Sequence, residues 1–132
     1  MTAQDTRYGE EVRRRFALLP GAGELAPGEH VVQGSAGDRE QGAAIKLQFR
    51  IERGRVAAAR FRAFGCPHFL AGASWLTDRF VGAHRTDLER WDWREAADTL
   101  QVPPAKYARF ITLQDAVRAA ARNWPDDAVS TV

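Results

Sequence analysis

One stretch of strictly alternating side chains constrains the fold more than any other feature of this sequence. Residues 45–52 place an apolar side chain at every second position, as expected for a strand with one buried face. A turn at Arg53-Gly54 leads into residues 56–64, which alternate in the same way. The apolar positions of the two strands are Ile45, Leu47, Phe49, Ile51, Ala57, Ala59, Phe61 and Ala63. The pattern predicts an antiparallel hairpin packed on a core.

Helical periodicity surrounds this hairpin. It predicts an amphipathic helix over residues 7–19, with Asp5 or Thr6 as its cap. A second helix is expected to begin at Pro67, with Cys66 as its N-cap, and to end near Phe80. One or two short helices follow within residues 86–101, and a last helix runs from Pro103-Pro104 to Pro125.

The remaining segments complete a small fold. Residues 30–33 are a short strand candidate, residues 34–43 a polar loop, and residues 126–132 a frayed tail. These elements predict an α+β fold with a small antiparallel three-stranded sheet and helices packed on one face. A length of 132 residues predicts a single domain over residues 1–132, with an ordered core of about residues 7–124.

Composition and charge exclude several classes of protein. No apolar run approaches the ~20 residues that span a bilayer, and residues 1–9 lack a signal core, so a cytoplasmic protein without membrane contact is expected. The net charge is only +2. Arg13-Arg14-Arg15 follows Glu10 and Glu11, which predicts ion pairs along a solvated helix face and gives no indication of a nucleic-acid partner.

Few side chains could carry chemistry. Cys66 at a helix N-terminus is either an activated thiolate or a small buried apolar residue. His68 forms a Cys-x-His pair with it, which is either half of a metal site or an ordinary core or surface histidine. Asp38 and Glu40 are either oxygen ligands or solvated loop residues. No hydrolase motif is present, so the sequence does not predict an enzyme.

Several motifs occur in an order that resembles one family. The matching segments are the opening helix at residues 8–12, the strand at 45–49, a strand ending in Phe-Gly-Cys at residues 59–66, the small residues 71–74, an LPPVK-like run at 102–106, and the final helix from residue 115. Together they resemble the iron–sulfur cluster scaffold family of IscU and the NifU N-terminal domain, over about residues 8–124. This resemblance implies that family's fold.

The resemblance also implies a site that this sequence only partly keeps. Members of the family hold a [2Fe–2S] cluster or zinc with three cysteines, an aspartate and sometimes a histidine. Only the second cysteine is present, as Cys66. An ungapped alignment puts Gln41 at the first cysteine and Ala43 at the aspartate. A four-residue insertion instead puts Ala36 at that cysteine and keeps the aspartate as Asp38.

The third cysteine of the family is replaced by Arg109, and Ala108 stands where IscU has a histidine. A guanidinium at this position would repel iron but stabilise a thiolate, bind an anion, or pair with Asp38. A complete cluster site needs about four ligands, and one chain offers Cys66 with His68 and Asp38 as weak candidates.

Three functional hypotheses follow. The first is a scaffold-like protein of iron–sulfur cluster assembly in which Cys66 accepts sulfur, or in which two Cys66 thiols bridge a [2Fe–2S] cluster or zinc across a homodimer, completed by two His68 side chains or external thiols. The second is a paralogue that binds no cluster and acts as regulator or adaptor of the assembly machinery. The third, an enzyme with Cys66 as nucleophile and His68 as base, is disfavoured because residues two apart rarely point together.

The resemblance also suggests partners. In IscU, the LPPVK segment is recognised by a dedicated Hsp70 chaperone. Its counterpart here comprises Val102, Pro103, Pro104, Ala105 and Lys106. A cysteine desulfurase and an Hsp70-type chaperone system are therefore the partners that the resemblance implies.

Overall fold

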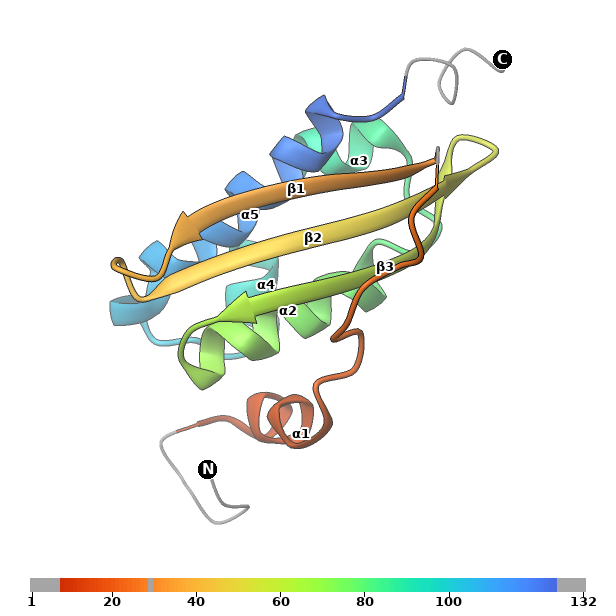
Figure 1. Ribbon diagram of the computed structural model, residues 1–132. Helices are drawn as coiled ribbons and strands as arrows, with labels where there is room; N and C mark the ends of the chain where they lie inside the picture. Colours follow the sequence, from red (N-terminus) through yellow and green to blue (C-terminus); the bar gives the residue numbers. More distant parts are fainter. Residues whose placement is uncertain (1–7, 29, 126–132) are drawn as a thin grey trace.

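The computed structural model describes residues 8–28 and 30–125, and combines a three-stranded antiparallel sheet with helices (Figure 1). The sheet order is β1-β2-β3. In chain order the elements are α1 (Glu10–Leu18), β1 (Val31–Asp38), β2 (Ala43–Glu52), β3 (Arg55–Phe64), α2 (Pro67–Arg79), α3 (Arg85–Arg90), α4 (Arg94–Thr99), the 3₁₀ turn η1 (Pro104–Lys106) and α5 (Tyr107–Arg122). The α+β prediction is confirmed. The N-cap of α1 is Gly9, so the prediction of a cap at Asp5 or Thr6 is wrong. Asp5, Thr6 and the tail 126–132 lie outside the described residues.

The hairpin of β2 and β3 is present as the alternation predicted, with one irregularity. Arg50 pairs with Ala58, but Ile51 pairs with Val56, so Ala57 is an extra residue in β3. Such a bulge reverses which face the preceding side chains occupy. Val56 is consequently buried and Ala57 only half-buried, so the prediction that Ala57 shares the buried face of Ala59 is wrong.

The first strand is twice as long as its pattern indicates. The sequence predicts a strand over residues 30–33 and a loop over 34–43, but β1 pairs with β2 from Val31↔Arg50 to Asp38↔Ala43. The residues of β1 are small and polar and show no apolar alternation. A tertiary contact, and not their own pattern, makes them a strand. At Gly34 an added Cβ would lie 2.1 Å from the Ala116 carbonyl oxygen, so glycine lets α5 pack directly against the strand.

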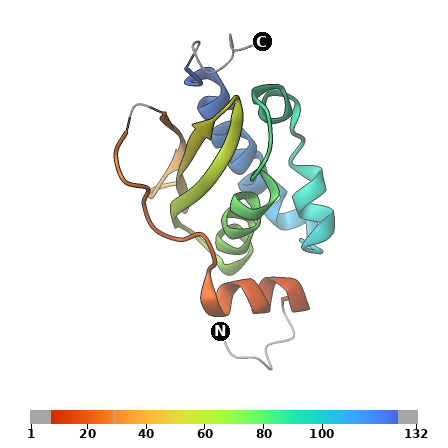
Figure 2. The same ribbon diagram turned by 90° about the vertical axis from the view of Figure 1, so that its right-hand side faces the viewer.

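The helices cover one face of the sheet only. α2 and α5 lie behind the sheet in Figure 1, and α1 packs below α2, as the turned view in Figure 2 shows. The largest fully buried side chains of this layer are Phe49, Phe69, Phe80 and Phe110. Burial of each such side chain contributes about 1.5–3 kcal/mol to stability. Within residues 8–28 and 30–125, no helix is long and apolar enough to cross a membrane.

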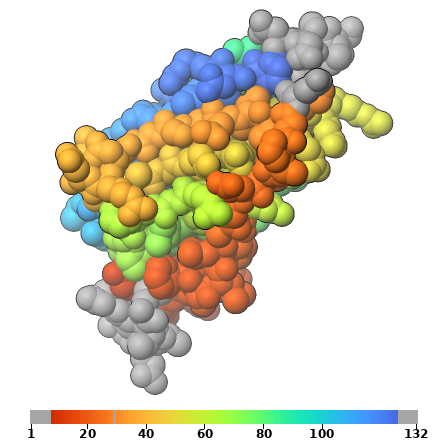
Figure 3. Space-filling model, viewed as in Figure 1, coloured from red at the N-terminus to blue at the C-terminus, as the bar shows by residue number. Residues whose placement is uncertain are grey.

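None of the described helices covers the opposite face of the sheet, but the segment between α1 and β1 crosses part of it, and its Leu25 N–H donates to Gln48 Oε1 at 2.8 Å (Figure 1). Figure 3 shows the orange, yellow and green strands exposed on the front of the molecule, with no helix over them. A hollow of about 400 Å³ lies at one end of this face. Lys46 and Arg62 stand in it and both pair with Glu24, at 3.0 and 3.1 Å. The prediction of helices on one face is confirmed.

The helix boundaries follow the turn chemistry. Residues 86–101 contain two short helices, α3 and α4, in agreement with the sequence. The last helix begins later than expected: Pro103-Pro104 leads into the 3₁₀ turn η1, and α5 starts at Tyr107. Two prolines in a row favour extended backbone at the first, so the α-helix cannot start there.

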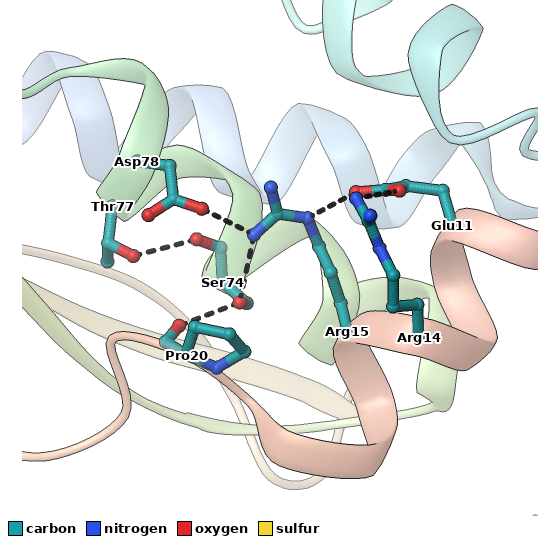
Figure 4. A network of polar contacts seen from close by, with 7 residues as sticks. All are labelled: Glu11, Arg14, Arg15, Pro20, Ser74, Thr77 and Asp78. Atoms are coloured by element: carbon teal, nitrogen blue, oxygen red, sulfur yellow. Dashed lines mark hydrogen bonds and ion pairs between the residues drawn. The ribbon is translucent and has the colours of Figure 1, made fainter.

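The arginine run of α1 is only partly solvated (Figure 4). Arg14 is exposed and pairs with Glu11 at i,i+3, as predicted. Arg15, however, has a side chain only 12% exposed. It bonds to Glu11 and Asp78, both at 2.8 Å, and its Nη1 donates to Ser74 at 3.3 Å. The predicted i,i+3 and i,i+4 ion pairs are therefore confirmed, but the prediction of a solvated face is wrong at Arg15, which joins α1 to α2.

Candidate functional site

Cys66 lies at the junction between β3 and α2. It is the N-cap of α2, with extended backbone (φ −72°, ψ 167°), and Pro67 follows at the first helical position. Its carbonyl accepts the first helical hydrogen bond, from the Leu70 N–H at 3.0 Å. The thiol is half-buried and makes no capping hydrogen bond. The predicted placement of Cys66 at the N-cap is confirmed, and the residue is only partly buried against the core.

His68 is a core residue. Only 4% of it is exposed, and its ring lies against Tyr8, with 4.8 Å between the ring centroids. Burial lowers the pKa of His68 below its usual range, and the positive charge of Lys106 lowers it further. Its Nδ1 has no hydrogen-bond partner. His68 is thus a neutral imidazole directed into the fold, which does not suit a ligand shared with a second molecule.

The turn between β1 and β2 contains the other candidate positions. Asp38 Oδ1 accepts a hydrogen bond from the Gln41 N–H at 2.8 Å, so this carboxylate holds the turn together. Gly42 has a positive φ of 83°, a conformation that glycine adopts without strain. In the described part of the chain, Asp38 forms no ion pair with Arg109, so the pairing that the sequence left open is not observed.

Arg109 reaches this turn from the first helical turn of α5. It is half-buried, and its Nη1 donates to the Gly42 carbonyl oxygen at 2.8 Å. A Cβ at Gly42 would lie 3.1 Å from the same nitrogen, so the guanidinium packs directly over the glycine. A cavity of about 270 Å³ lies here, lined by Gln41, Ala43, Ala105, Ala108, Arg109 and Thr112.

This cavity bears on the two alignments of the sequence. The residues that face Arg109 across it are Gln41 and Ala43, the positions of the ungapped alignment. Asp38 and Ala36 lie earlier, paired in the ladder of β1 with Ala43 and Ile45. The structure therefore brings together Gln41, Ala43, Ala108 and Arg109 around this cavity, with Asp38 paired beside Ala43.

The donor set in this region does not suit a metal ion or cluster on one chain. Among the residues that the structure describes, no three His, Cys, Asp or Glu side chains lie close enough to share a metal ion. A cluster needs about four ligands, and a guanidinium is always cationic. The charge and the ligand count therefore both oppose a cluster bound within a single chain.

The LPPVK-like run is a surface turn anchored at one end. Val102 is buried, and its N–H donates to the Ala97 carbonyl at 2.9 Å. Pro103, Pro104 and Ala105 are exposed, and Lys106 is half-buried at the N-cap of α5. The segment can therefore be reached by another protein without unfolding of the helix that follows it.

Comparison with known proteins decides the family. The family model described as the NifU-like N terminal domain matches residues 7–130. The chain belongs to this family. The "Iron-sulfur cluster assembly protein IscU" of Plasmodium falciparum (isolate 3D7) is 29% identical over 118 residues, which cover 89% of this chain and 73% of that protein. The "Iron-sulfur cluster assembly scaffold protein IscU" of Escherichia coli (strain K12) is 29% identical over 97 residues, covering 73% and 76%.

Solved structures confirm the fold. A crystal structure described as an iron–sulfur cluster assembly scaffold protein for the SUF system, from Fervidobacterium islandicum AW-1, aligns with a TM-score of 0.69 at 12% identity, covering 89% of this chain and 98% of that one. The N-terminal part of a nitrogen-fixing NifU-like protein from Brucella abortus aligns with a TM-score of 0.65 at 15% identity, covering 87% and 92%. The fold of this NifU-like domain is thus shared with proteins of very different sequence.

The sequence did not predict two features of this NifU-like domain: the cavity, and the hydrogen bond from Arg109 to Gly42. Thr112, one helical turn after Ala108, was not identified as a lining residue. The hollow on the open sheet face was missed as well, although the polar alternation of β2 and β3 places Lys46 and Arg62 on one surface. Such alternation is the signal that could have found it.

Proposed function

We propose that this protein serves iron–sulfur cluster assembly as a scaffold-like member of its family that holds no cluster on a single chain. Its relatives carry names of assembly and scaffold proteins, which supports the pathway. The observation that carries the rest is the bond from Arg109 Nη1 to the Gly42 carbonyl. A fixed cation occupies the position at which the family resemblance expects the third cysteine.

In this role the protein is an adaptor or regulator of the assembly machinery, and its chemistry is binding. The family resemblance implies two partners, a cysteine desulfurase and an Hsp70-type chaperone. They would contact the exposed turn at Pro103-Pro104 and the half-buried Cys66. Catalysis by a Cys66–His68 pair is not supported, because His68 packs inward against Tyr8. Cys66 can still accept a sulfur atom without a metal: its thiolate attacks the outer sulfur of a persulfide on a partner's cysteine, the S–S bond of that persulfide breaks, and the partner's cysteine leaves as a thiolate.

A second candidate function is favoured by the exposure of Cys66. Because Cys66 is only partly buried, two chains could each offer it to a shared [2Fe–2S] cluster or zinc ion. External thiols would then complete the ligand set. The buried His68 does not suit this role.

Anaerobic reconstitution with iron and sulfide separates the two candidates. We expect the wild-type protein and Cys66→Ala to bind no stoichiometric iron or acid-labile sulfide. A restored variant, Gln41→Cys with Ala43→Asp and Arg109→Cys, is expected to bind both, since it places the donor types of the family around the cavity. This variant is the positive control for the reconstitution chemistry, and circular dichroism checks its folding, because Ala43 is only 4% exposed.

Binding of iron and sulfide by the wild-type protein would contradict this expectation. About one [2Fe–2S] cluster per two wild-type chains, lost in Cys66→Ala, would overturn the proposal and establish the dimer-bridged scaffold.

A pull-down with a cysteine desulfurase then tests the adaptor role. We expect binding that persists in Cys66→Ala, and a desulfurase that does not bind at all would contradict the role.

A further inference from the structure

The cavity beside Arg109 is open to solvent, since Gln41, Ala105 and Ala108 in its lining are exposed, and it is large enough for a small ligand. Its volume of about 270 Å³ would hold roughly nine water molecules at about 30 Å³ each, which is the scale of a small organic molecule. Ala43, Ala105 and Ala108 contribute short apolar walls. Gln41, Arg109 and Thr112 contribute polar groups to the same space.

Positive charge in this region has no counter-ion among the described residues. Arg109 donates one N–H to Gly42, and a guanidinium has five, so its other donors have no protein acceptor there. Lys106, the N-cap of α5, does not line the cavity and forms no ion pair in the same part of the chain, and the first turn of α5 contains no acidic residue. Two like charges at the positive end of a helix macrodipole are unfavourable unless an anion compensates them.

The neighbouring carboxylates do not supply that compensation. Asp38 directs its Oδ1 to the Gln41 N–H in its own turn. Glu40 is exposed, and it forms no ion pair with Arg109 in the described structure. The cation at Arg109 is therefore held in place by the backbone and left available to a ligand.

We propose that this cavity binds a small organic carboxylate. Its two oxygens meet the free edge of the Arg109 guanidinium, and its carbon skeleton contacts the alanine walls. The planar fork of arginine matches the two oxygens of a carboxylate. The inference rests on the proposed function in one respect, since it requires that no cluster fills the site.

A titration with succinate, followed by ¹H–¹⁵N NMR, tests the site. We expect saturable shifts of the Arg109 side-chain Nε–H and of the Gly42 backbone N–H. Succinamide, which has the same skeleton without the charge, is expected to cause none. Arg109→Gln should weaken binding about ten-fold or more, the equivalent of about 1.4 kcal/mol. Arg90→Gln, at an exposed position of α3, should leave binding unchanged.

Other outcomes would overturn the carboxylate site. These are shifts that do not saturate, succinate binding that is equal in wild type and Arg109→Gln, or tighter binding of inorganic phosphate than of succinate. Circular dichroism of each variant confirms that it is folded. Iron and sulfide content, measured separately, reports on the proposed function, so a wild-type chain that loads a cluster and a chain that binds no carboxylate are distinguishable failures.

Discussion

Two half-buried arginines, Arg15 and Arg109, occupy very different surroundings. Arg15 connects α1 to α2 and has partners on each side: Glu11, Asp78 and Ser74 (Figure 4). Arg109 bonds to one backbone carbonyl, at Gly42, and lines a cavity. A cation that pairs with carboxylates on two helices holds those helices together, whereas a cation without a counter-ion in the described structure is available for binding. The surroundings of Arg15 therefore indicate a structural role, and those of Arg109 indicate a role in binding.

Loss of Arg15 is expected to give the largest effect on stability. Arg15→Leu leaves Glu11 and Asp78 without their partly buried partner, and we expect a decrease of about 2 kcal/mol in the free energy of unfolding. Urea denaturation measures it. Arg14→Leu is the control, because Arg14 is 73% exposed and should cost less than about 0.5 kcal/mol. Equal effects of the two substitutions would show that Arg15 is no anchor.

Ser74→Ala should have the next largest effect. The Ser74 hydroxyl is buried, donates to the Pro20 carbonyl at 2.7 Å and accepts from Arg15. Its loss leaves a carbonyl without its donor, so we expect about 1 kcal/mol of destabilisation in the same urea experiment. In the double variant with Arg15→Leu the two costs should not add, because the residues share one network. Strict additivity would contradict a shared network.

The stability of the protein is expected to depend on pH through His68, which follows Cys66 by two residues. Its folded-state pKa lies below its ordinary value of 6.5, so the unfolded chain binds the proton more readily. Stability from this group is therefore complete above pH 6.5 and is lost as the pH falls below that value toward the folded-state pKa. Thermal unfolding between pH 5 and 8 should show this decline, and His68→Phe should reduce it. An unchanged slope in His68→Phe would assign the decline to other groups.

Arg109→Leu should have the smallest effect on stability. Because Arg109 has one backbone partner and shares the start of α5 with Lys106, we expect a change within about 0.5 kcal/mol. Urea denaturation beside Arg15→Leu gives the direct contrast. A cost as large as that of Arg15→Leu would mean that both arginines are structural, and would remove the energetic basis for a ligand site.

Much of the fold follows from local pattern. The alternation from Ile45 to Ile51 predicts β2, and the arrangement of Cys66 before Pro67 predicts the N-cap of α2; both are present. Ala57 was assigned to the wrong face because a bulge depends on pairing with the neighbouring strand, which alternation alone does not show. The role of Cys66 itself stays a proposal.

The sequence by itself determined the hairpin, the helix periods, the solitary thiol and the replacement of a family cysteine by Arg109. Tertiary structure alone decided that residues 34–38 are a strand, because pairing with β2 and the close approach of α5 at Gly34 supply what their own side chains lack. It also decided that Gln41 and Ala43, and not Asp38, face Arg109. The side chains that line a cavity depend on strand register and helix placement, and both are long-range properties of the chain.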